Sequence, residues 1–270
     1  CQNAGNVVCA INDGGELVGF GHTQIEKYAY KDFVHTLTIC ISPEYRDRAV
    51  ENILLDQLHQ NLQKQYRIFR LSNKHMCQIR VAEPLAKLRE LVCNYAYTLD
   101  AIHRMYALQI PTVADDYELP DGIIIRKPEK KEKRKIWKLM QREMANQWGN
   151  HHITRKQFES WNSVTADLDD LWLTAWNKSM LIGFIQNACT YVNNNPIGYI
   201  HILAIDRRWR RKKIASALLK KSHILYKGNG INKVYTESIT DCNQKQIPIF
   251  EKNGFTLFRS DEYYKRTLFD

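Results

Sequence analysis

The sequence predicts a protein of the α/β class (α+β) that consists of two similarly built domains. Segments in which apolar and polar residues alternate, as in strands, are interspersed with amphipathic segments of helical period. Residues 111–122 are acidic, contain two prolines and follow neither period, which is typical of a linker. A third observation is that part of the first half recurs in the second. With 270 residues, the chain has the length of two ordinary domains.

Before the linker, strands are predicted at residues 6–11, 17–25, 33–41, 68–71 and 101–110. Asp13-Gly14-Gly15 is typical of a hairpin turn between the first two strands. A helix is predicted after the turn at Ser42, because apolar residues recur there with helical period at Val50, Ile53, Leu54, Leu58 and Leu62. Pro84 near the first turn indicates a second helix at residues 83–94.

After the linker, the same patterns predict strands at residues 123–126, 171–176, 180–191, 198–205, 233–239 and 263–268, and helices at residues 129–148, 154–161, 211–226 and 244–252. We therefore expect a first domain at residues 1–115 and a second at residues 116–270. The first domain lacks counterparts of the strand and helices that precede Leu171, and the sequence begins at Cys1 without a Met. For these reasons we expect the first domain to be truncated.

The net charge of +10 arises in the second half of the chain. Residues 1–120 contain 12 basic and 14 acidic residues, whereas the rest of the chain contains 27 basic and 15 acidic ones. An acidic ligand or a nucleic acid would account for this excess. A solvated helix face would do so as well, and it is the expected role of most of residues 127–138.

The cysteine and histidine patterns give no sign of a metal site. The seven cysteines have neither metal-ligand nor redox spacing, which favours a reducing, cytoplasmic setting. His151-His152 has no third ligand in the sequence, so no metal is predicted. No apolar run approaches the ~20 residues that a membrane-spanning helix needs.

Residues 205–220 predict an anion-binding turn. An apolar strand leads into a run from Arg207 to Lys213 in which every residue except Trp209 is cationic, and the helix that follows begins with small residues at 215–217. Backbone N–H groups at a helix N-terminus point outward and carry a partial positive charge. A strand that runs into such a helix therefore offers a site for a diphosphate.

The two halves share a sequence pattern at an offset of 164 residues. Leu17-Val18-Gly19-Phe20 matches Leu181-Ile182-Gly183-Phe184. At the same offset, Ile41-Ser42-Pro43-Glu44-Tyr45-Arg46 matches Ile205-Asp206-Arg207-Arg208-Trp209-Arg210. One offset that holds across strands and a loop indicates an internal repeat.

With these residues, the second half resembles the GNAT N-acetyltransferase superfamily. The family motif Arg/Gln-x-x-Gly-x-Gly/Ala corresponds to Arg210-Arg211-Lys212-Lys213-Ile214-Ala215. A second signature, Asn followed by Tyr-x-x-x-Gly-Phe, corresponds to Asn243 and Phe250-Glu251-Lys252-Asn253-Gly254-Phe255. The whole chain resembles tandem GNAT proteins of the mycothiol synthase type. The resemblance implies two GNAT-like domains, each a mixed, mostly antiparallel twisted sheet flanked by helices.

The resemblance implies acetyl-CoA as co-substrate, bound in the second domain. The residues that it assigns to the cofactor are Leu203, Ala204, Ile205, Arg210, Arg211, Lys212, Lys213, Ile214, Ala215, Asn243 and Phe250. Lys213 replaces the first glycine of the motif, which is acceptable if its backbone is helical and its side chain points outward.

The first domain departs further from the family pattern. Asp47 and Glu51 lie in its turn and would repel a diphosphate, so this copy is expected to be degenerate in CoA binding. The alternative is that it binds a CoA with altered geometry.

The resemblance further implies that an amine attacks the thioester directly in a ternary complex. A base must take the ammonium proton, and Glu237 is the first candidate, ahead of His201. The proton donor of the family, a Tyr, is Phe250 here, and a phenyl ring has no proton to donate. Another group could donate the proton instead, and the candidates are Cys242, Tyr235 and Ser238. The remaining alternatives are that the thiolate leaves without a proton donor, or that the domain no longer catalyses.

Three functions are compatible with the sequence. The first is an N-acetyltransferase whose acceptor is a small-molecule or peptide amine: a small amine, an amino acid, an antibiotic or a protein amine. The second is a catalytically inactive acyl-CoA-binding or assembly domain. Nucleic-acid binding ranks last, because one CoA explains the cations and no other recognition motif is present. The sequence is also compatible with a homodimer. Four tryptophans are interpreted first as core and second as lining of the acceptor cleft: Trp137, Trp148, Trp161 and Trp172.

Overall fold

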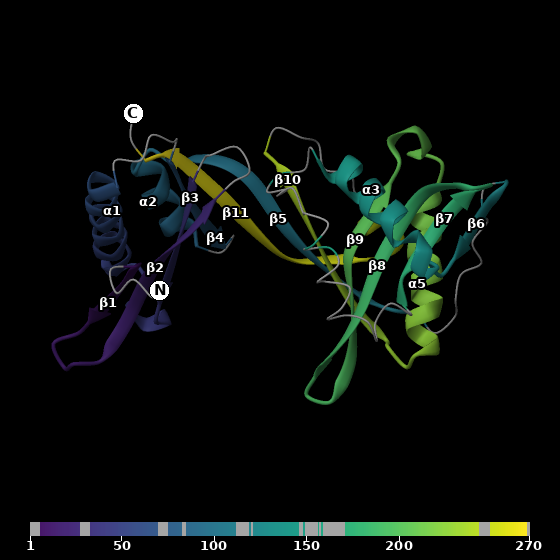
Figure 1. The fold of residues 1–270 in the computed structure, drawn as a ribbon. Coiled ribbons are helices and arrows are strands. Elements are labelled where there is room, and N and C mark those ends of the chain that lie inside the picture. The colour runs from purple at the N-terminus through teal and green to yellow at the C-terminus, as the bar shows by residue number, and fades with distance from the viewer. Residues whose placement is uncertain are drawn as a thin grey trace. The chain divides into compact units, whose positions relative to one another are not determined.

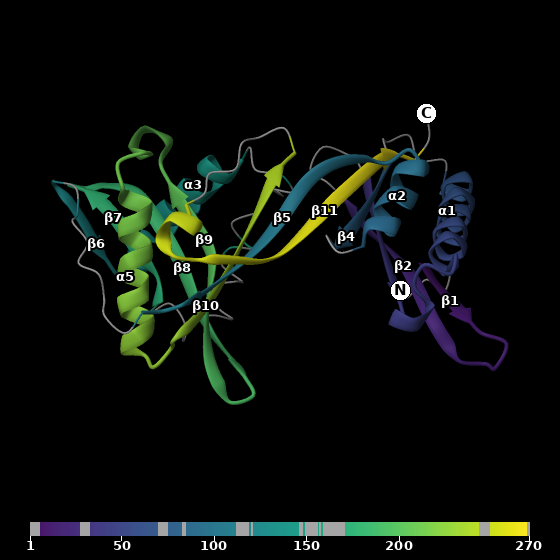
Figure 2. The same cartoon turned by 180° about the vertical axis from the view of Figure 1, so that it is seen from behind.

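The computed structural model describes residues 6–27, 33–69, 75–82, 85–111, 119, 121–145, 148, 156, 158, 171–242 and 249–268 (Figures 1 and 2). The chain divides into two compact units, which we call unit 1 (Cys1–Ile102 with Asp261–Asp270) and unit 2 (His103–Ser260). Each unit has a mixed, mostly antiparallel sheet with helices against it, as the sequence predicts.

The division differs from the boundary expected after residue 115. Two long strands, β5 (Thr98–Gln109) and β11 (Thr256–Thr267), contribute residues to both units. The end of β11 pairs with β4 (His75–Ala82) from Asp261↔Ala82 to Thr267↔Met76, and this pairing places the last ten residues in unit 1. Local features such as prolines, glycines and charge clusters do not reveal strand pairing between residues far apart in the sequence.

In unit 1 the strand order is β1-β2-β3-β4-β11. Only the pairing of β3 with β4 is parallel among the pairs described for this unit. Two helices, α1 and α2, contribute leucine and valine side chains to the core on one face of the sheet. The further elements are β1 (Val7–Ile11), β2 (Leu17–Lys27), β3 (Phe33–Ile41), α1 (Val50–Phe69) and α2 (Ala86–Asn94), and a 3-10 turn, η2, at Pro43–Tyr45.

The strand predicted at residues 68–71 is wrong for the residues that are described. Ile68 lies in α1, and the strand is β4 instead. β4 has the sequence HMCQIRVA, in which the buried positions include His75 and Gln78. In β4, Cys77, Ile79 and Val81 alternate with Gln78 and Arg80, so the sequence does contain a strand pattern here, a few residues after the predicted one.

In unit 2 the strand order is β5-β10-β9-β8-β7-β6, and β9 and β10 run parallel. The predicted helix at residues 129–148 is described as a 3-10 turn, η3 (Lys130–Glu132), followed by α3 (Lys133–Met144). The predicted helices at 154–161 and 244–252 lie largely outside the described residues. The further elements are β6 (Ile123–Arg126), β7 (Leu173–Asn177), β8 (Met180–Val192), β9 (Asn195–Ile205), η5 (Arg207–Trp209), α5 (Ile214–Gly228), β10 (Lys233–Asp241) and η6 (Glu251–Asn253).

Helices α3 and α5 cover opposite faces of the unit 2 sheet, as Figures 1 and 2 together show. Successive residues of β8 alternate between the two cores: Phe184 packs with α3, and Ile185 packs with α5. Gly198 of β9 lets Tyr226 of α5 lie flat on the strand, because a Cβ at this position would be 2.8 Å from the tyrosine ring.

The internal repeat is present in the structure. Gly19 pairs with Ile41 in unit 1, and Gly183 pairs with Ile205 in unit 2. Each glycine is closely approached by a leucine of the following helix, Leu54 or Leu218, 3.4 Å from an added Cβ in both cases. All three pairs of positions are 164 residues apart, so strand register and helix register repeat together.

The two units differ in what covers the face opposite α1 or α5. In unit 2, α3 packs against Trp176 and Phe184, which are 4% and 0% exposed. The unit 1 residues at the same places in the strand ladders, Ile11 and Phe20, are 63% and 38% exposed. No helix among the described residues of unit 1 covers them.

Candidate functional site

Strands β9 and β10 separate part of the way along their length. Their parallel pairing is described from Gly198↔Val234 to Ile200↔Thr236. β9 continues for five further residues, to Ile205, while it remains paired with β8 on its other side. We call the start of this separation the fork. Leu203, Ala204 and Ile205, predicted to contact the cofactor, lie beyond the fork, where one edge of β9 can hydrogen-bond a ligand.

A β-bulge lies at the fork. Gln186 is opposite Ile202 and Asn187 is opposite Ile200, so His201 has no residue opposite it on β8. A bulge bends its strand and locally disrupts the ladder, which favours the separation of β9 from β10. The equivalent β2–β3 ladder in unit 1 runs without a shift from Gly19↔Ile41 to Lys27↔Phe33.

Beyond the fork, β9 leads into η5 and then α5 through a turn with two residues in the left-handed region. Arg211 has φ 61°, and Lys213, the residue before the first turn of α5, has φ 59°. Glycine adopts this conformation without strain. The condition that the Lys213 backbone be helical is therefore not met: its backbone has the conformation that the motif glycine would supply. Its side chain is exposed.

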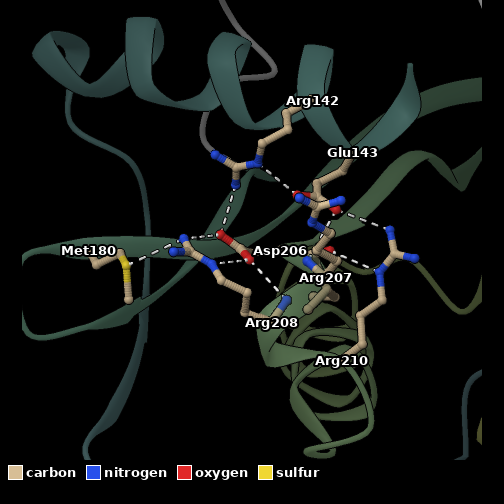
Figure 3. Close-up of polar contacts among 8 residues, drawn as sticks. Arg142, Glu143, Met180, Asp206, Arg207, Arg208 and Arg210 are labelled. Atoms are coloured by element: carbon tan, nitrogen blue, oxygen red, sulfur yellow. Dashed lines mark hydrogen bonds and ion pairs between the residues drawn. The ribbon is translucent and has the colours of Figure 1, made fainter. Parts of the chain in front are cut away.

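Two carboxylates, those of Asp206 and Glu143, bind arginine side chains of the cationic run (Figure 3). Asp206, 1% exposed, accepts from Nη2 of Arg208 and Nη2 of Arg142, both at 2.8 Å. Glu143 of α3 accepts from Nη2 of Arg210 at 3.1 Å. The hydrogen bonds from Arg208 are the main reason why the pKa of Asp206 is lowered to about 2, and the charge of Arg142 contributes.

Glu143 also accepts the backbone N–H of Arg207 at 3.1 Å, so α3 is fastened directly to the turn. Arg208 and Arg210 thus stabilise the turn itself, and Arg210 also donates from Nε to the carbonyl of Ile205 at 3.3 Å. Four exposed cations of the run remain, and three of them, Arg211, Lys212 and Lys213, directly precede α5; the fourth is Arg207. Nζ of Lys212 lies 4.6 Å from the ring centroid of Trp209.

Glu237 and His201, the two predicted bases, lie together at the fork. Nε2 of His103, on β5, is 2.9 Å from Oε2 of Glu237, and the Tyr199 hydroxyl also hydrogen-bonds this carboxylate. The Glu237 side chain is 41% exposed. Burial lowers the pKa of His201, and the charge of Glu237 partly opposes the shift. Burial, followed by the Glu237 charge, raises the pKa of Tyr199 above its usual range.

The predicted substitutes for the proton donor are spread along β10. Ser238 follows Glu237 directly, and its Oγ is buried without a hydrogen-bond partner in the described structure. Tyr235 lies before the fork and packs edge-on against Phe258, at 5.6 Å between ring centroids. Cys242 follows the end of β10, about 16 Å along the strand from Glu237 at ~3.3 Å per residue. The structure does not bring Cys242 and Glu237 together.

Phe250 packs in an aromatic cluster. Its ring centroid is 5.6 Å from that of Tyr106 and 5.6 Å from that of Phe255. The Tyr106 hydroxyl donates to Oε1 of Glu251 at 3.3 Å. Asn243, predicted to contact the cofactor, lies outside the described residues. Trp172 is a core residue, 2% exposed, and Trp137 packs at the margin of the same core, whereas Trp161 is not described.

Sequence reasoning missed the contribution of β5 to this site. His103 is 5% exposed and contacts Glu237, yet it precedes the predicted linker. Its signal in the sequence is a histidine within a mostly apolar strand pattern, AIHRMYALQI.

The turn of unit 1 has the same backbone shape but different chemistry. Asp47 and Ala49, 164 residues before Arg211 and Lys213, have φ values of 62° and 66°. The backbone N–H of Asp47 donates to Oε1 of Glu51 at 3.0 Å. In unit 1 a carboxylate of the chain itself therefore binds a turn N–H group.

The described residues contain neither a metal-binding cluster nor a membrane-spanning helix. No cluster of three or more His, Cys, Asp or Glu side chains is arranged to hold a metal ion in this part of the chain. None of the described helices combines the length and apolar composition needed to span a membrane.

The sequence and the fold were compared with known proteins. Residues 133–255 match the family model described as Acetyltransferase (GNAT) family. No curated protein matches the sequence. Among solved structures, a GCN5-related N-acetyltransferase from Sphaerobacter thermophilus is similar with a TM-score of 0.77 and 16% identity, over 99% of this chain and 82% of that one.

Two further solved structures have the same fold. A fungal GCN5-related glucosamine N-acetyltransferase region of a multi-domain β-N-acetylglucosaminidase has a TM-score of 0.65 and 15% identity, over 96% of this chain and 33% of that one. A tandem GNAT protein from the clavulanic acid biosynthesis pathway has a TM-score of 0.58 and 12% identity, over 96% and 82%.

The matched residues contain the fork, the bulge and the turn at the start of α5, and the similar structures have the fold expected from the motifs. GNAT enzymes transfer acyl groups from acyl-CoA. Residues 133–255 therefore match the GNAT acetyltransferase family, and the fold of the chain is similar to that of GNAT N-acetyltransferases.

Proposed function

We propose that unit 2 transfers an acetyl group from acetyl-CoA to an amine by direct attack in a ternary complex. The observation that carries this proposal is the continuous path formed by the fork, the β-bulge at His201 and the left-handed turn before α5. This path presents unpaired strand edge and helix N-terminal N–H groups in succession, which suits a long thiol ester with a diphosphate at one end.

The cofactor would lie along this path. The diphosphate would accept hydrogen bonds from backbone N–H groups of residues 211–215, and the exposed Arg211, Lys212 and Lys213 would balance its charge. The pantetheine arm would pair with the free edge of β9 at residues 203–205. This arrangement leaves the thioester at the fork, where Glu237 and His201 lie.

Glu237 would act as the base. A free amine attacks the thioester carbonyl, and because most amines are protonated at neutral pH, a carboxylate that removes the proton increases the reactive fraction. Attack forms the carbon–nitrogen bond and gives a tetrahedral intermediate that carries one further proton on nitrogen. As the carbon–sulfur bond breaks, this second proton is lost to the leaving thiolate, directly or through a donor, so that the amide and CoA are the products. Among the three candidate donors, Ser238 follows Glu237 on β10, so its side chain lies on the opposite face of the strand, and its hydroxyl is buried without a described partner.

Unit 1 would not bind CoA. The Glu51 carboxylate already accepts the backbone N–H of Asp47. In addition, the β2–β3 ladder, which is equivalent to β8–β9, has no β-bulge. The acceptor would be a small-molecule or peptide amine, and a cytoplasmic location fits the need for acetyl-CoA.

The proposal is tested by calorimetric titration with acetyl-CoA, followed by assays of CoA release with a panel of amines. Lys213→Glu should weaken acetyl-CoA binding at least tenfold, because a carboxylate replaces a cation beside the diphosphate. The matched change in unit 1, Ala49→Glu, should leave affinity within twofold. Equal affinity in both variants would place the cofactor elsewhere.

Catalytically inactive acyl-CoA binding is the second candidate. It is favoured by Phe250, which occupies the position of the family's tyrosine and is packed against Tyr106 and Phe255. Binding without CoA release in the presence of any amine, together with an unchanged rate in Glu237→Gln, would favour it. Nucleic-acid binding is disfavoured because Asp206 and Glu143 already bind two of the arginines.

A further inference from the structure

We propose that His103 positions the Glu237 carboxylate for catalysis, so that β5, a strand before the linker, supplies part of the active site. This inference rests on the proposed role of Glu237 as the base. It makes a strand that precedes the predicted linker necessary for the chemistry of the residues that follow the linker.

The contact is made by a buried histidine and a partly exposed carboxylate. His103 is 5% exposed, its Nε2 lies 2.9 Å from Oε2 of Glu237, and the glutamate side chain is 41% exposed. A buried donor that holds one oxygen of an exposed carboxylate fixes its orientation while the carboxylate still faces solvent. This combination is what a base needs if it is to meet an acceptor from outside.

Strand β5 is held in place independently of this contact. It lies beside β10 in the sheet, and Nη1 of Arg104 donates to Oγ1 of Thr240 at 3.1 Å. Successive side chains of a strand point to opposite faces, so Arg104 lies on the face opposite His103. Tyr106 and Leu108 anchor the same strand in the core beneath α5. The histidine is thus presented from a rigid element.

The expected chemical effect follows from hydrogen bonding. A neutral imidazole with its proton on Nε2 donates to the carboxylate, and the Tyr199 hydroxyl makes a second contact from β9. Donors to a carboxylate stabilise its charged form and lower its pKa. With one oxygen held by His103, the carboxylate would keep a single orientation toward the ammonium group of the acceptor.

The test uses the full chain with three substitutions of His103. His103→Leu removes the donor and should lower kcat about tenfold to 100-fold with little change in acetyl-CoA affinity. The acid limb of the pH–rate profile should move to higher pH, since the carboxylate loses a donor. His103→Gln places an amide N–H near the position of Nε2 and should restore activity and profile, whereas the shorter His103→Asn should not.

The control is Arg104→Leu, which removes the neighbouring side chain on the opposite face. It should leave the acid limb in place, and thermal unfolding of all variants shows which of them fold. If His103→Leu does not fold, the comparison of Gln with Asn decides the question.

The possible outcomes separate this inference from the proposed function. If wild type transfers acetyl groups and Glu237→Gln does not, while His103→Leu and His103→Asn keep the wild-type kcat and acid limb, His103 has no positioning role. If wild type releases no CoA, or Glu237→Gln retains full activity, the proposed function itself fails, and this inference fails with it.

Discussion

Replacing Ala215 with glutamate would transfer to unit 2 the contact that occupies the turn of unit 1. Glu51, the equivalent of Ala215, accepts the N–H of Asp47 at 3.0 Å. The two turns have nearly the same backbone, with φ values of 62° and 66° in unit 1 and 61° and 59° in unit 2. The new carboxylate of Ala215→Glu should therefore reach the N–H of Arg211.

The effect on cofactor affinity can be estimated from this geometry. A hydrogen bond to a charged group contributes about 1.5–3 kcal/mol, and the diphosphate would have to displace it. Like charges about 5 Å apart repel by about 1–3 kcal/mol at a protein surface. We take a combined loss on the order of 3 kcal/mol, which lowers acetyl-CoA affinity on the order of 100-fold.

The assay is calorimetric titration of acetyl-CoA into wild type, Ala215→Glu and the control Ala215→Gln. The glutamine variant keeps the length of the side chain without its charge and should lose roughly tenfold or less. High salt should recover part of the affinity of the glutamate variant but not of the glutamine variant. Binding of Ala215→Glu within threefold of wild type, with unchanged unfolding, would refute the assignment of this turn to the diphosphate.

Three further outcomes follow from contacts outside the site. Ala49→Gly should raise the free energy of unfolding by about 0.5–1 kcal/mol in urea denaturation, because alanine is strained at positive φ; a loss of stability would contradict this. Burial lowers the pKa of His59 to about 4. The neutral imidazole therefore stabilises the fold above pH 6.5, and this stability is lost as the pH falls from 6.5 toward 4. Between pH 7 and 5 the free energy of unfolding should fall by about 2 kcal/mol. Urea unfolding of His59→Gln should show a correspondingly weaker pH dependence, and an unchanged one would argue against this source. Phe184→Ala should lower the free energy of unfolding by about 3–5 kcal/mol, whereas Phe20→Ala, at the half-exposed equivalent position in unit 1, should lower it by under about 1.5 kcal/mol. Equal losses in thermal unfolding would show that the Phe20 face of unit 1 is covered as well.

Much of the architecture follows from local sequence. The repeat around Gly19 and Gly183 predicts two similar units, because each glycine allows close approach of a helix at the same register. β4 was predictable as well, since Cys77, Ile79 and Val81 alternate with polar residues, whereas the strand expected at residues 68–71 overlaps the end of α1. The exchange of β11 into unit 1 depends on long-range strand pairing, which leaves no local pattern.

The site was predicted only in part. The cationic run located the turn, but which cations face a ligand depends on two distant carboxylates, and Glu143 comes from a helix 64 residues away from Arg207. Glu237 and His201 were predicted as alternatives and lie together at the fork. His103 was missed because only the sheet order places β5 beside β10.

The left-handed pair at Asp47 and Ala49 has a consequence for how this architecture can change. Unit 1 keeps the backbone of the turn although Glu51 fills it. The shape is therefore set by the connection of strand to helix and does not depend on a ligand. If unit 1 does not bind CoA, as we propose, the turn has been kept without its cofactor, and unit 1 offers a scaffold for building a new anion site, beginning with the removal of the Glu51 carboxylate.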